Sequence, residues 1–402
     1  MIRSLKVACL LAFTSVTKGN FRIALLTMLI LILVALNLLF VPGLLDGLVW
    51  GANDKLINTY SGDLLIEPDE GNRYIANVDQ LMTEIDQIDG IKSATARNYL
   101  GAEIDFEGKY LDTTVFGVYP DTEKTVFTIT DYIIEGSYLT PDDTDTIILG
   151  VQLAGADRPN LELYARSLQN VHAGDRVSVT YANGIQKEYT VKGVFYTEFI
   201  QTDLQAFVSE KEFQTVAPLL ANNASAIYIK TTEDADTDGI INQILSTTNG
   251  LKVATWEDHA GLVHSMTASF KIIEVIMDVV NLLVAGITIF IVTYIDVANR
   301  KRQIGIQRAI GITPASITLS YLIRALFYAF IALALAALIY IYGIIPLEAH
   351  YPFHFPFGDV YLRVIPFVLI RTALLLFGVS IISALLPVHG VMRAKIIDAI
   401  WS

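Results

Sequence analysis

The sequence predicts an α-helical membrane protein with four transmembrane helices and a large mixed α/β extracytoplasmic domain inserted between helices 1 and 2. Three observations support this fold class. The chain of 402 residues is 53% hydrophobic and only 17% charged, whereas a typical soluble domain has about 25% charged residues. Its net charge is nevertheless −13, so acidic and apolar residues must lie in different parts of the chain. Finally, long apolar segments flank one long polar region, residues 46–269.

Four apolar segments have the length needed to cross a bilayer, which takes about 20 residues. They are residues 23–45, 270–297, 319–345 and 362–387. The first contains no charged residue, and the second has an uncharged centre at residues 279–295. The first segment is too long for a signal peptide, and no small-x-small cleavage motif follows it. We therefore expect it to be retained as a transmembrane helix.

Basic residues indicate the orientation of these segments, because cytoplasmic loops are enriched in Lys and Arg. Only basic charges occur before the first segment and in residues 298–318: Arg3, Lys6, Lys18, Arg22, Arg300, Lys301, Arg302 and Arg308. The short loop at residues 346–361 instead contains Glu348 and Asp359 among many Pro and aromatic residues. We therefore predict a multi-pass protein of the cell (inner) membrane, with both termini and residues 298–318 in the cytoplasm and residues 46–269 outside.

The pattern of the polar region at residues 46–269 predicts a mixed α/β domain. It has 35 acidic and 14 basic residues, a net charge of −21, while the rest of the chain carries +8. Apolar residues at helical spacing predict helices at 78–88 and 237–247. Alternating apolar residues predict strands at 63–66, 113–118, 176–181, 189–194 and 226–229. Asn183 and Gly184 predict a hairpin because both accept positive φ, and we expect two subdomains with a break near residues 150–171.

The sequence contains no pattern typical of an enzyme active site, so we expect no catalytic residue and no cofactor bound by this chain. GxSxG and HExxH motifs are missing, and a single cysteine, Cys9, excludes an intramolecular disulfide or a CxxC site. His350 and His354 form an HxxxH pair, but in a Pro- and Phe-rich loop rather than on a helix, and we expect no metal there. No GxxxxGK[ST] loop occurs, so any ATP and Mg must bind a partner chain. The acidic charge argues against nucleic acid.

One motif in residues 298–318 is not explained by charge. It reads Arg302-Gln303-Ile304-Gly305-Ile306-Gln307-Arg308-Ala309-Ile310-Gly311. Ile304, Arg308 and Ala309 are spaced to share one side of a short helix, which Gly311 would end and Thr313-Pro314 would start again. A basic loop at the membrane surface would account for the arginines. It would not account for the ordered Ile-Gly-Ile and Ala-Ile-Gly pattern.

This motif resembles the cytoplasmic coupling segment of ABC transporter permeases of the MacB/FtsX/LolC-E type, whose pattern is close to R-E-I-G-I-x-R-A-x-G. Gln303 departs from the usual Glu. The resemblance covers essentially the whole chain, as an FtsX-like permease with a MacB-like periplasmic core domain. It implies that residues 1–22 form an amphipathic helix on the cytoplasmic face and that residues 388–402 form a cytoplasmic tail.

The resemblance implies a permease subunit without its own nucleotide-binding domain. A separate ABC ATPase would bind the coupling segment at Arg302, Gln303, Ile304, Gly305, Ile306, Arg308, Ala309 and Gly311. Its movements would travel along the second helix, whose stalk begins near Trp256, and would export or extract a hydrophobic substrate, lipoprotein or peptide. Further implied partners are a second permease subunit, identical or related, membrane lipid, and a periplasmic adaptor or lipoprotein. The alternative is an FtsX-like signalling scaffold that transports nothing and regulates an extracytoplasmic hydrolase or a sensor.

Two charged residues inside the predicted spans lie at matching depth. At 1.5 Å per residue, Asp278 lies roughly 10 Å beyond Lys271, and Arg371 about 12 Å beyond Arg363. Since unpaired charges in a bilayer are costly, we predict an intramembrane Asp278–Arg371 pair. The alternative is that Arg371 snorkels or faces a water-filled crevice. We expect Arg324, near the cytoplasmic interface, to snorkel.

Overall fold

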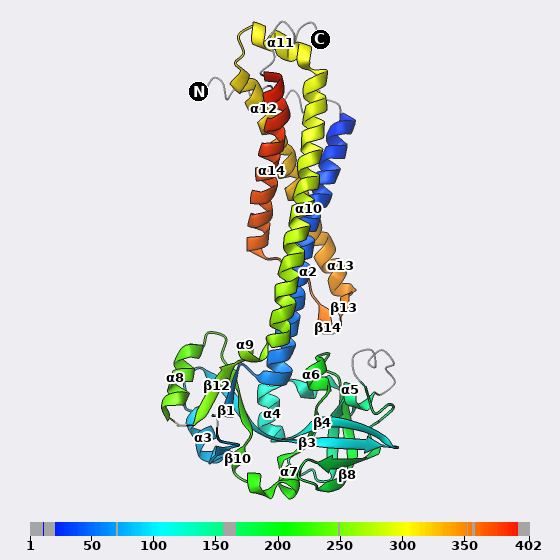
Figure 1. The fold of residues 1–402 in the computed structure, drawn as a ribbon, viewed down its shortest axis with the longest axis vertical. Coiled ribbons are helices and arrows are strands. Elements are labelled where there is room, and N and C mark those ends of the chain that lie inside the picture. The colour runs from blue at the N-terminus through cyan, green and yellow to red at the C-terminus, as the bar shows by residue number, and fades with distance from the viewer. Residues whose placement is uncertain are drawn as a thin grey trace. The chain divides into compact units, whose positions relative to one another are not determined.

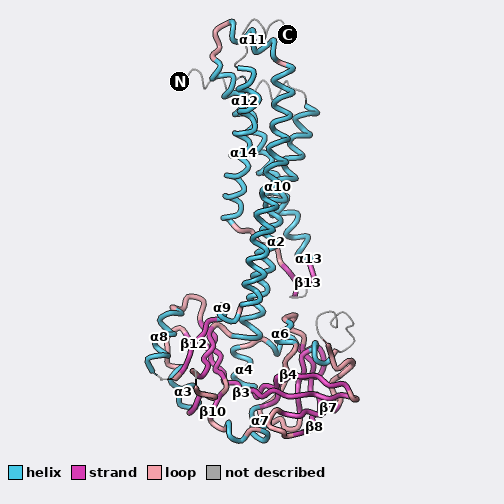
Figure 2. The backbone as a smooth tube through the Cα atoms, in the orientation of Figure 1, coloured by secondary structure: helices cyan, strands magenta, loops and turns pink. Residues whose placement is uncertain are grey.

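The computed structural model of the protein describes residues 11, 21–69, 71–155, 166–247, 250–351, 353–355 and 358–392. The chain forms two compact units, whose elements are shown in Figures 1 and 2. The helical unit comprises Met1–Leu48, Met266–Phe353 and Val360–Ser402, and the α/β unit comprises Val49–Ser265 and His354–Asp359. Most of the predicted amphipathic helix at residues 1–22 and of the predicted tail at 388–402 lies outside the described residues.

Among the described residues, four helical segments are long and apolar enough to cross a membrane: Ala24–Ser61, Thr267–Asn299, Pro314–His350 and Pro366–Gly390. The four predicted transmembrane helices are thus confirmed. The elements are α2 (Phe21–Lys55), η1 (Leu56–Ser61), α10 (Gly261–Asn299), α11 (Lys301–Ala309), α12 (Pro314–Ile339), η5 (Tyr340–Ile344), α13 (Ile345–His350) and α14 (Pro366–Met392). Two short strands, β13 (Phe353–Phe355) and β14 (Gly358–Val360), lie between α13 and α14. Both α2 and α10 extend beyond the apolar segments, because a helix needs apolar side chains only where it meets lipid.

Small residues allow the helices of the helical unit to pack closely. Ala325, Ala329, Ala332 and Ala336 follow one another on α12 at spacings of three and four residues, and all four are buried. They share one core with residues of α2, α10 and α14: Leu31, Ala35, Leu38, Ala285, Leu376 and Ala384. In a membrane, close van der Waals packing of this kind replaces the hydrophobic effect as the source of helix association.

The α/β unit is built on a ten-stranded sheet with the order β12-β1-β11-β3-β4-β9-β6-β8-β5, and β7 pairs with both β3 and β8. Its strands are β1 (Leu64–Pro68), β3 (Ile91–Phe106), β4 (Lys109–Val118), β5 (Ile133–Gly136), β6 (Thr146–Gly150), β7 (Arg176–Tyr181), β8 (Gln186–Phe195), β9 (Ala206–Ser209), β11 (Ala226–Thr231) and β12 (Leu251–Thr255). A second sheet pairs β2 (Ile75–Ala76) with β10 (Asn223–Ala224). The 16-residue strand β3 pairs with β11, β4 and β7 and so joins the two ends of the main sheet.

Short helices connect these strands (Figure 2). They are α3 (Val78–Ile85), α4 (Pro120–Val126), η2 (Ile129–Tyr132), α5 (Val151–Ala154), α6 (Ile200–Asp203), α7 (Glu210–Val216), η4 (Pro218–Leu220), α8 (Thr237–Thr247) and α9 (Trp256–His259). The predicted helix at 237–247 and the predicted strand at 176–181 have the bounds of α8 and β7. The predicted helix at 78–88 ends earlier, at Ile85.

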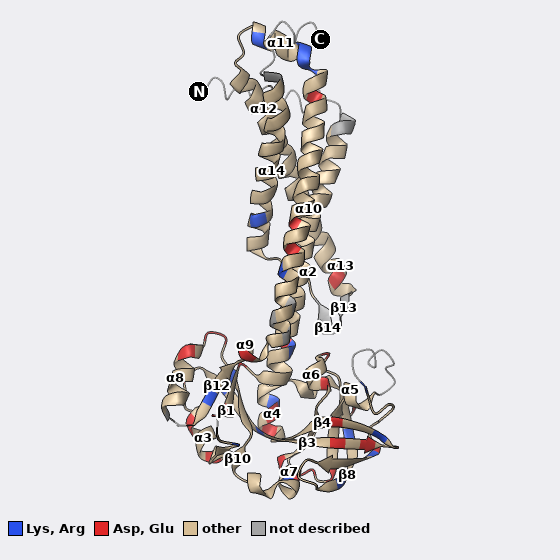
Figure 3. Cartoon of the chain, in the orientation of Figure 1, with Lys and Arg blue, Asp and Glu red and all other residues tan. Residues whose placement is uncertain are grey.

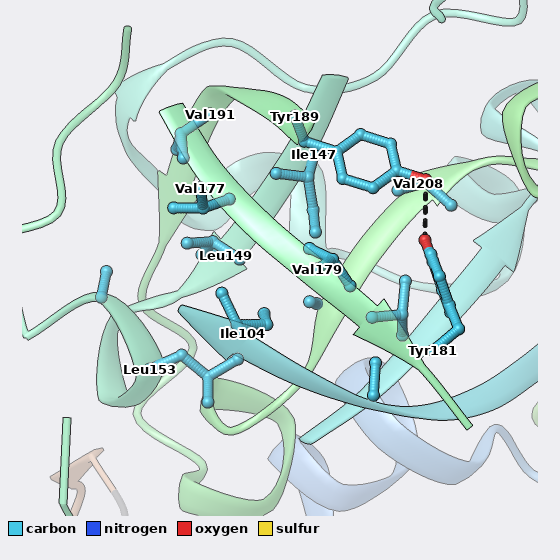
Figure 4. Close-up of a cluster of buried hydrophobic side chains, with 14 of the residues drawn as sticks. Ile104, Ile147, Leu149, Leu153, Val177, Val179, Tyr181, Tyr189, Val191 and Val208 are labelled. Atoms are coloured by element: carbon cyan, nitrogen blue, oxygen red, sulfur yellow. Dashed lines mark hydrogen bonds between the residues drawn. The ribbon is translucent and has the colours of Figure 1, made fainter. Parts of the chain in front are cut away.

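The predicted hairpin at Asn183-Gly184 is confirmed, but only Gly184 has a positive φ, of 84°. Asn183 contributes hydrogen bonds instead: its Oδ1 accepts from the Ile185 backbone N–H (3.1 Å), and its Nδ2 donates to the Val216 carbonyl (2.8 Å). The two strands pack into the core shown in Figure 4, where the Tyr181 and Tyr189 hydroxyls are hydrogen bonded at 2.8 Å. The turn is therefore held by one left-handed glycine and one Asn side chain.

Described residues on both sides of the predicted break near residues 150–171 contribute to one core, and the break itself stays a prediction. Leu149, Leu153, Leu168 and Val177 lie in the same core, because β6, α5 and β7 pack against one another there. A different core is formed by α3, α8 and the strands around β1, including Leu64, Ile85, Ile227 and Ile244. The inner division thus follows the sheet, and each part draws on segments distant in sequence.

A wholly buried ion pair ties β3 to α4. The Arg97 side chain is 0% exposed and its Nε donates to Oε1 of Glu123 at 3.0 Å. Its guanidinium also lies over the rings of Phe127 and Tyr228, 3.9 and 4.7 Å from their centroids. Stacking and pairing together compensate for the cost of removing two charges from water.

Glu210, at the start of α7, is buried without a charged partner. Its Oε1 accepts from Asn98 Nδ2 at 3.1 Å and from Gln214 Nε2 at 3.4 Å, while its Oε2 has no hydrogen-bond partner among the described residues. Burial raises the pKa of this carboxyl from near 4.5 to about 7, against the lowering effect of the two amide donors. The folded α/β unit therefore holds a proton that the unfolded chain releases near pH 4.5.

We predict that the free energy of unfolding of the α/β unit falls as the pH rises from 4.5 to about 7, because the unfolded chain can release the Glu210 proton while the folded unit retains it. Above about pH 7 this group should cause no further loss of stability. Between pH 5 and pH 8 the wild-type free energy of opening should fall by about 2 kcal/mol more than that of Glu210→Gln, which keeps a neutral side chain throughout. Amide hydrogen exchange of β3 and β4 in the full-length protein measures this difference. Equal pH dependence in both proteins would contradict the assignment.

Candidate functional site

The predicted coupling segment forms a helix between two membrane-spanning helices. After α10 ends at Asn299, α11 runs from Lys301 to Ala309. Gly311 follows with a φ of 94°, a conformation that favours glycine. Thr313 then caps α12, where its Oγ1 accepts a hydrogen bond from the Ser316 N–H (3.3 Å) and Pro314 occupies the first turn. The sequence thus ends one helix and begins another within a few residues.

Ile304 anchors α11 to the rest of the helical unit. Its side chain is 3% exposed and lies in a cluster with Val297 of α10, Ile317 and Tyr321 of α12, and Val388 of α14. Gly305 beside it is also buried. Ile304 therefore positions α11 and does not face outward.

The opposite side of α11 is exposed and partly apolar. Ile306 is 47% and Ile310 73% exposed, and Arg302, Gln303 and Ala309 are exposed as well. Their spacing of three, four and seven residues places them on one face of the helix. The prediction that Ile304 and Ala309 share one side is wrong, since Ile304 is buried and Ala309 is exposed, while Arg308 is half-buried between them.

Asp296, a residue outside the predicted coupling segment, connects the end of α10 to the residue before α11 and to α12. Its Oδ1 lies 3.0 Å from Arg300 Nε, just before α11, and its Oδ2 lies 2.7 Å from Arg324 Nη1 on α12. The expectation that Arg324 snorkels is wrong: this residue is 7% exposed, and its guanidinium lies 4.8 Å from the centre of the Tyr321 ring. An acid inside an otherwise basic stretch, four residues before Arg300, was the available sequence signal.

The structure brings together the other two predicted residues and adds a third. Arg371 of α14 pairs through Nη2 with Asp278 and through Nη1 with Glu274, both on α10. The two acids are four residues apart on one helix face, so a single forked guanidinium reaches both. Figure 3 shows how few charged residues the long helices of the helical unit contain.

No group of three or more His, Cys, Asp or Glu residues able to hold a metal ion occurs in the part of the chain that the structure describes. His350 of the HxxxH pair has its Nδ1 2.8 Å from the Pro346 carbonyl, to which it donates when that nitrogen is protonated. The side chain of His354 lies outside the described part.

These features define a multi-pass membrane protein with a large α/β domain between its first and second spanning helices. Two family models match the chain: the MacB-like periplasmic core domain over residues 24–247, and the FtsX-like permease C-terminal domain over residues 275–396. The chain therefore belongs to the MacB/FtsX family of ABC transporter permeases, and its α/β domain is the extracellular domain of that family.

Solved structures with similarity to this chain include two domains of related proteins. The periplasmic region of MacB from Actinobacillus actinomycetemcomitans is 12% identical, with a TM-score of 0.34, over 51% of this chain and 94% of that one. The extracellular domain of the noncanonic ABC-type transporter YknZ from Gram-positive bacteria is 14% identical, with a TM-score of 0.33, over 48% and 98%. No curated protein sequence matches the chain. The family assignment rests on the two family models.

We predict that Asp296 and Arg324 are energetically coupled. Asp296→Asn should destabilise the full-length protein by about 2 kcal/mol, because it removes the carboxylate that pairs with the buried Arg324 guanidinium. Arg324→Gln in the Asp296→Asn background should cost much less than in the wild type, giving a coupling energy of about 1–2 kcal/mol. Denaturant titration of the detergent-solubilised protein measures the cycle, and additive effects would contradict the pairing.

We also predict that Ile304 and Ile306 differ sharply in their contribution to stability. Ile304→Ala should cost about 3 kcal/mol by opening a cavity in a well-packed cluster. Ile306→Ala, on the exposed face, should stay within about 0.5 kcal/mol of the wild type. The same titration distinguishes the two variants, and equal losses would mean that α11 packs differently.

Proposed function

We propose that this chain is the permease subunit of an ATP-driven transporter, in which a separate ATPase subunit binds α11 and drives the extracellular domain to export or extract a hydrophobic substrate, lipoprotein or peptide. The observation that carries this proposal is the two-sided construction of α11. One side is anchored by Ile304, and the other exposes Ile306 and Ile310. An anchored helix with an exposed apolar face is suited to receive a partner.

The charge of α11 supports a cytoplasmic location. Arg300 immediately precedes α11, and Lys301, Arg302 and Arg308 lie within it; positively charged loops stay on the cytoplasmic side. This orientation places both chain termini in the cytoplasm and the α/β domain outside. ATP would then be hydrolysed on the same side as α11, by the partner, since the sequence has no phosphate-binding GxxxxGK[ST] loop.

The helix α10 supplies a route for mechanical coupling. It is a single helix of 39 residues without an internal proline, so it has no built-in hinge of the proline type. Its first residues lie in the α/β domain, where Ala260 and Val263 pack with Ala52, Leu56 and Phe199. Its last turn carries Asp296, which pairs with Arg300 immediately before α11. Val297 of the same turn packs with Ile304 of α11. Movement of α11 would therefore be transmitted along a stiff rod.

The assembly would contain a second permease subunit, identical or related, together with the ATPase, membrane lipid and, outside, an adaptor or lipoprotein. Transport is favoured over an FtsX-like signalling role because the MacB-like core domain is matched over residues 24–247, the larger part of the chain.

We predict that Ile306→Glu weakens binding of the ATPase subunit at least about tenfold, or about 1.4 kcal/mol, because it places a charge in the apolar face of α11. Co-purification from membranes, followed by ATPase assay of the reconstituted complex, measures this. Leu219→Glu is the matched control. Leu219 is 90% exposed in the extracellular domain, so this variant should leave binding of the ATPase subunit unchanged. If the wild-type chain co-purifies with no ATPase, the proposed function is wrong.

A further inference from the structure

An apolar groove lies between α10 and α14 of the helical unit. It is lined on α10 by Val279, Leu283, Ile287 and Phe290 and on α14 by Val379 and Ile382, and its volume is about 430 Å³. Ser383 is the one lining residue with a polar side chain. Asp278 of α10 pairs with Arg371 of α14, and Gly286, eight residues further along α10, approaches Val379 and Ser383 of α14. The two helices therefore run in the same direction beside the groove.

Gly286 explains why the groove forms. A Cβ at this position would lie 3.1 Å from Val379 Cγ1 and from Ser383 Oγ, so the helices approach closely there. The larger side chains beside it stand apart and form open walls: Leu283, Ile287 and Ile382 are 59%, 57% and 62% exposed. The groove is therefore open to the lipid along its length.

The groove has a charged end. Glu274 and Asp278 precede it on α10, Arg371 precedes it on α14, and these three residues form ion pairs at the same helix–helix contact. Two carboxylates and one guanidinium leave one negative charge uncompensated when all are ionised, which is unfavourable in a medium of low dielectric constant. Arg371 is 29% exposed at its side chain, so the cluster is accessible from outside the protein. In the described residues no ion pair joins Lys271, one turn earlier, to either acid.

We propose that this groove binds a single phospholipid whose head group carries a primary amine. Its acyl chain would lie along the groove, and its ammonium, with three N–H donors, would meet Glu274 and Asp278 and supply the missing positive charge. From Val279 to Phe290 the groove extends roughly 17 Å along α10, somewhat more than half of a hydrocarbon core of about 30 Å. That length suits a chain from one leaflet.

Charge complementarity favours this lipid over a second copy of the chain. A second copy could cover the groove with an apolar helix. Its own Arg324 and Arg371 are already in ion pairs within the spans and cannot neutralise the cluster. The inference does not depend on an ATPase, so its failure would leave the proposed function standing.

The test uses the full-length chain in nanodiscs of phosphatidylglycerol that contain a minor fraction of phosphatidylethanolamine. Native mass spectrometry after release measures which lipids stay bound. Phosphatidylethanolamine should be enriched about tenfold over its share of the nanodisc, and its N-acetylated form, which has no charge on nitrogen, should not be enriched. Equal retention of the three lipids would overturn the proposal.

Three variants distinguish the apolar groove, which would bind the acyl chain, from the acidic cluster, which would bind the amine of the head group. Leu283→Trp fills the groove and should abolish the enrichment, whereas Val284→Trp, an exposed apolar position next to it that does not line the groove, should keep it. Glu274→Gln should nearly abolish the preference for the amine-containing lipid and leave total lipid retention unchanged. This variant tests the acidic cluster even if Leu283→Trp folds poorly. Equal loss in both Trp variants, or a change of oligomeric state in Leu283→Trp with the enrichment intact, would overturn the proposal.

Discussion

The packing of the helical unit around α11 depends on the two ion pairs of Asp296. One carboxylate holds Arg324, which is buried on α12, and Arg300, which stands immediately before α11. Since Asp296 lies in the last turn of α10, separating α10 from α12 there would take the carboxylate away from the buried Arg324 guanidinium, which is costly. Ile304 adds apolar contacts with α10, α12 and α14 at the same place. The short helix is therefore a fixed extension of the bundle.

The same rule of charge burial organises the rest of the molecule. Arg371 meets two acids of a neighbouring helix, and Arg97 meets Glu123 beneath a layer of aromatic rings. In each case the partner comes from a segment distant in sequence, so each pair fixes how two elements pack. Where no opposite charge is supplied, as at Glu210, burial raises the pKa to about 7 and the group can keep its proton. The cluster at the end of the groove has the same kind of imbalance, because Glu274 and Asp278 share the single cation Arg371.

The sequence was sufficient for features that depend on local patterns. Apolar length predicted the four spans, alternation predicted β7, and the order of Gly311, Thr313 and Pro314 predicted the end of α11 and the start of α12. It was not sufficient for β3, whose buried stretch contains the polar residues Arg97 and Asn98, because their partners Glu123 and Glu210 become neighbours only in the folded sheet. Glu274 was missed for the same reason. Asp296 was missed although Arg300 follows it by four residues, and Ala309 was wrongly placed on the same side of α11 as Ile304.

The central claim is that α11 and α10 move as one body, and a distance measurement tests it most directly. Spin labels at position 302 on α11 and position 291 on α10, in a Cys9→Ser background, report the separation of the two helices by double electron–electron resonance. The labelled chain is measured in complex with the proposed ATPase subunit, with and without ATP. We expect the same distance distribution in both states. A shift of α11 relative to α10 on adding ATP would contradict the account, because α11 would then move without carrying α10.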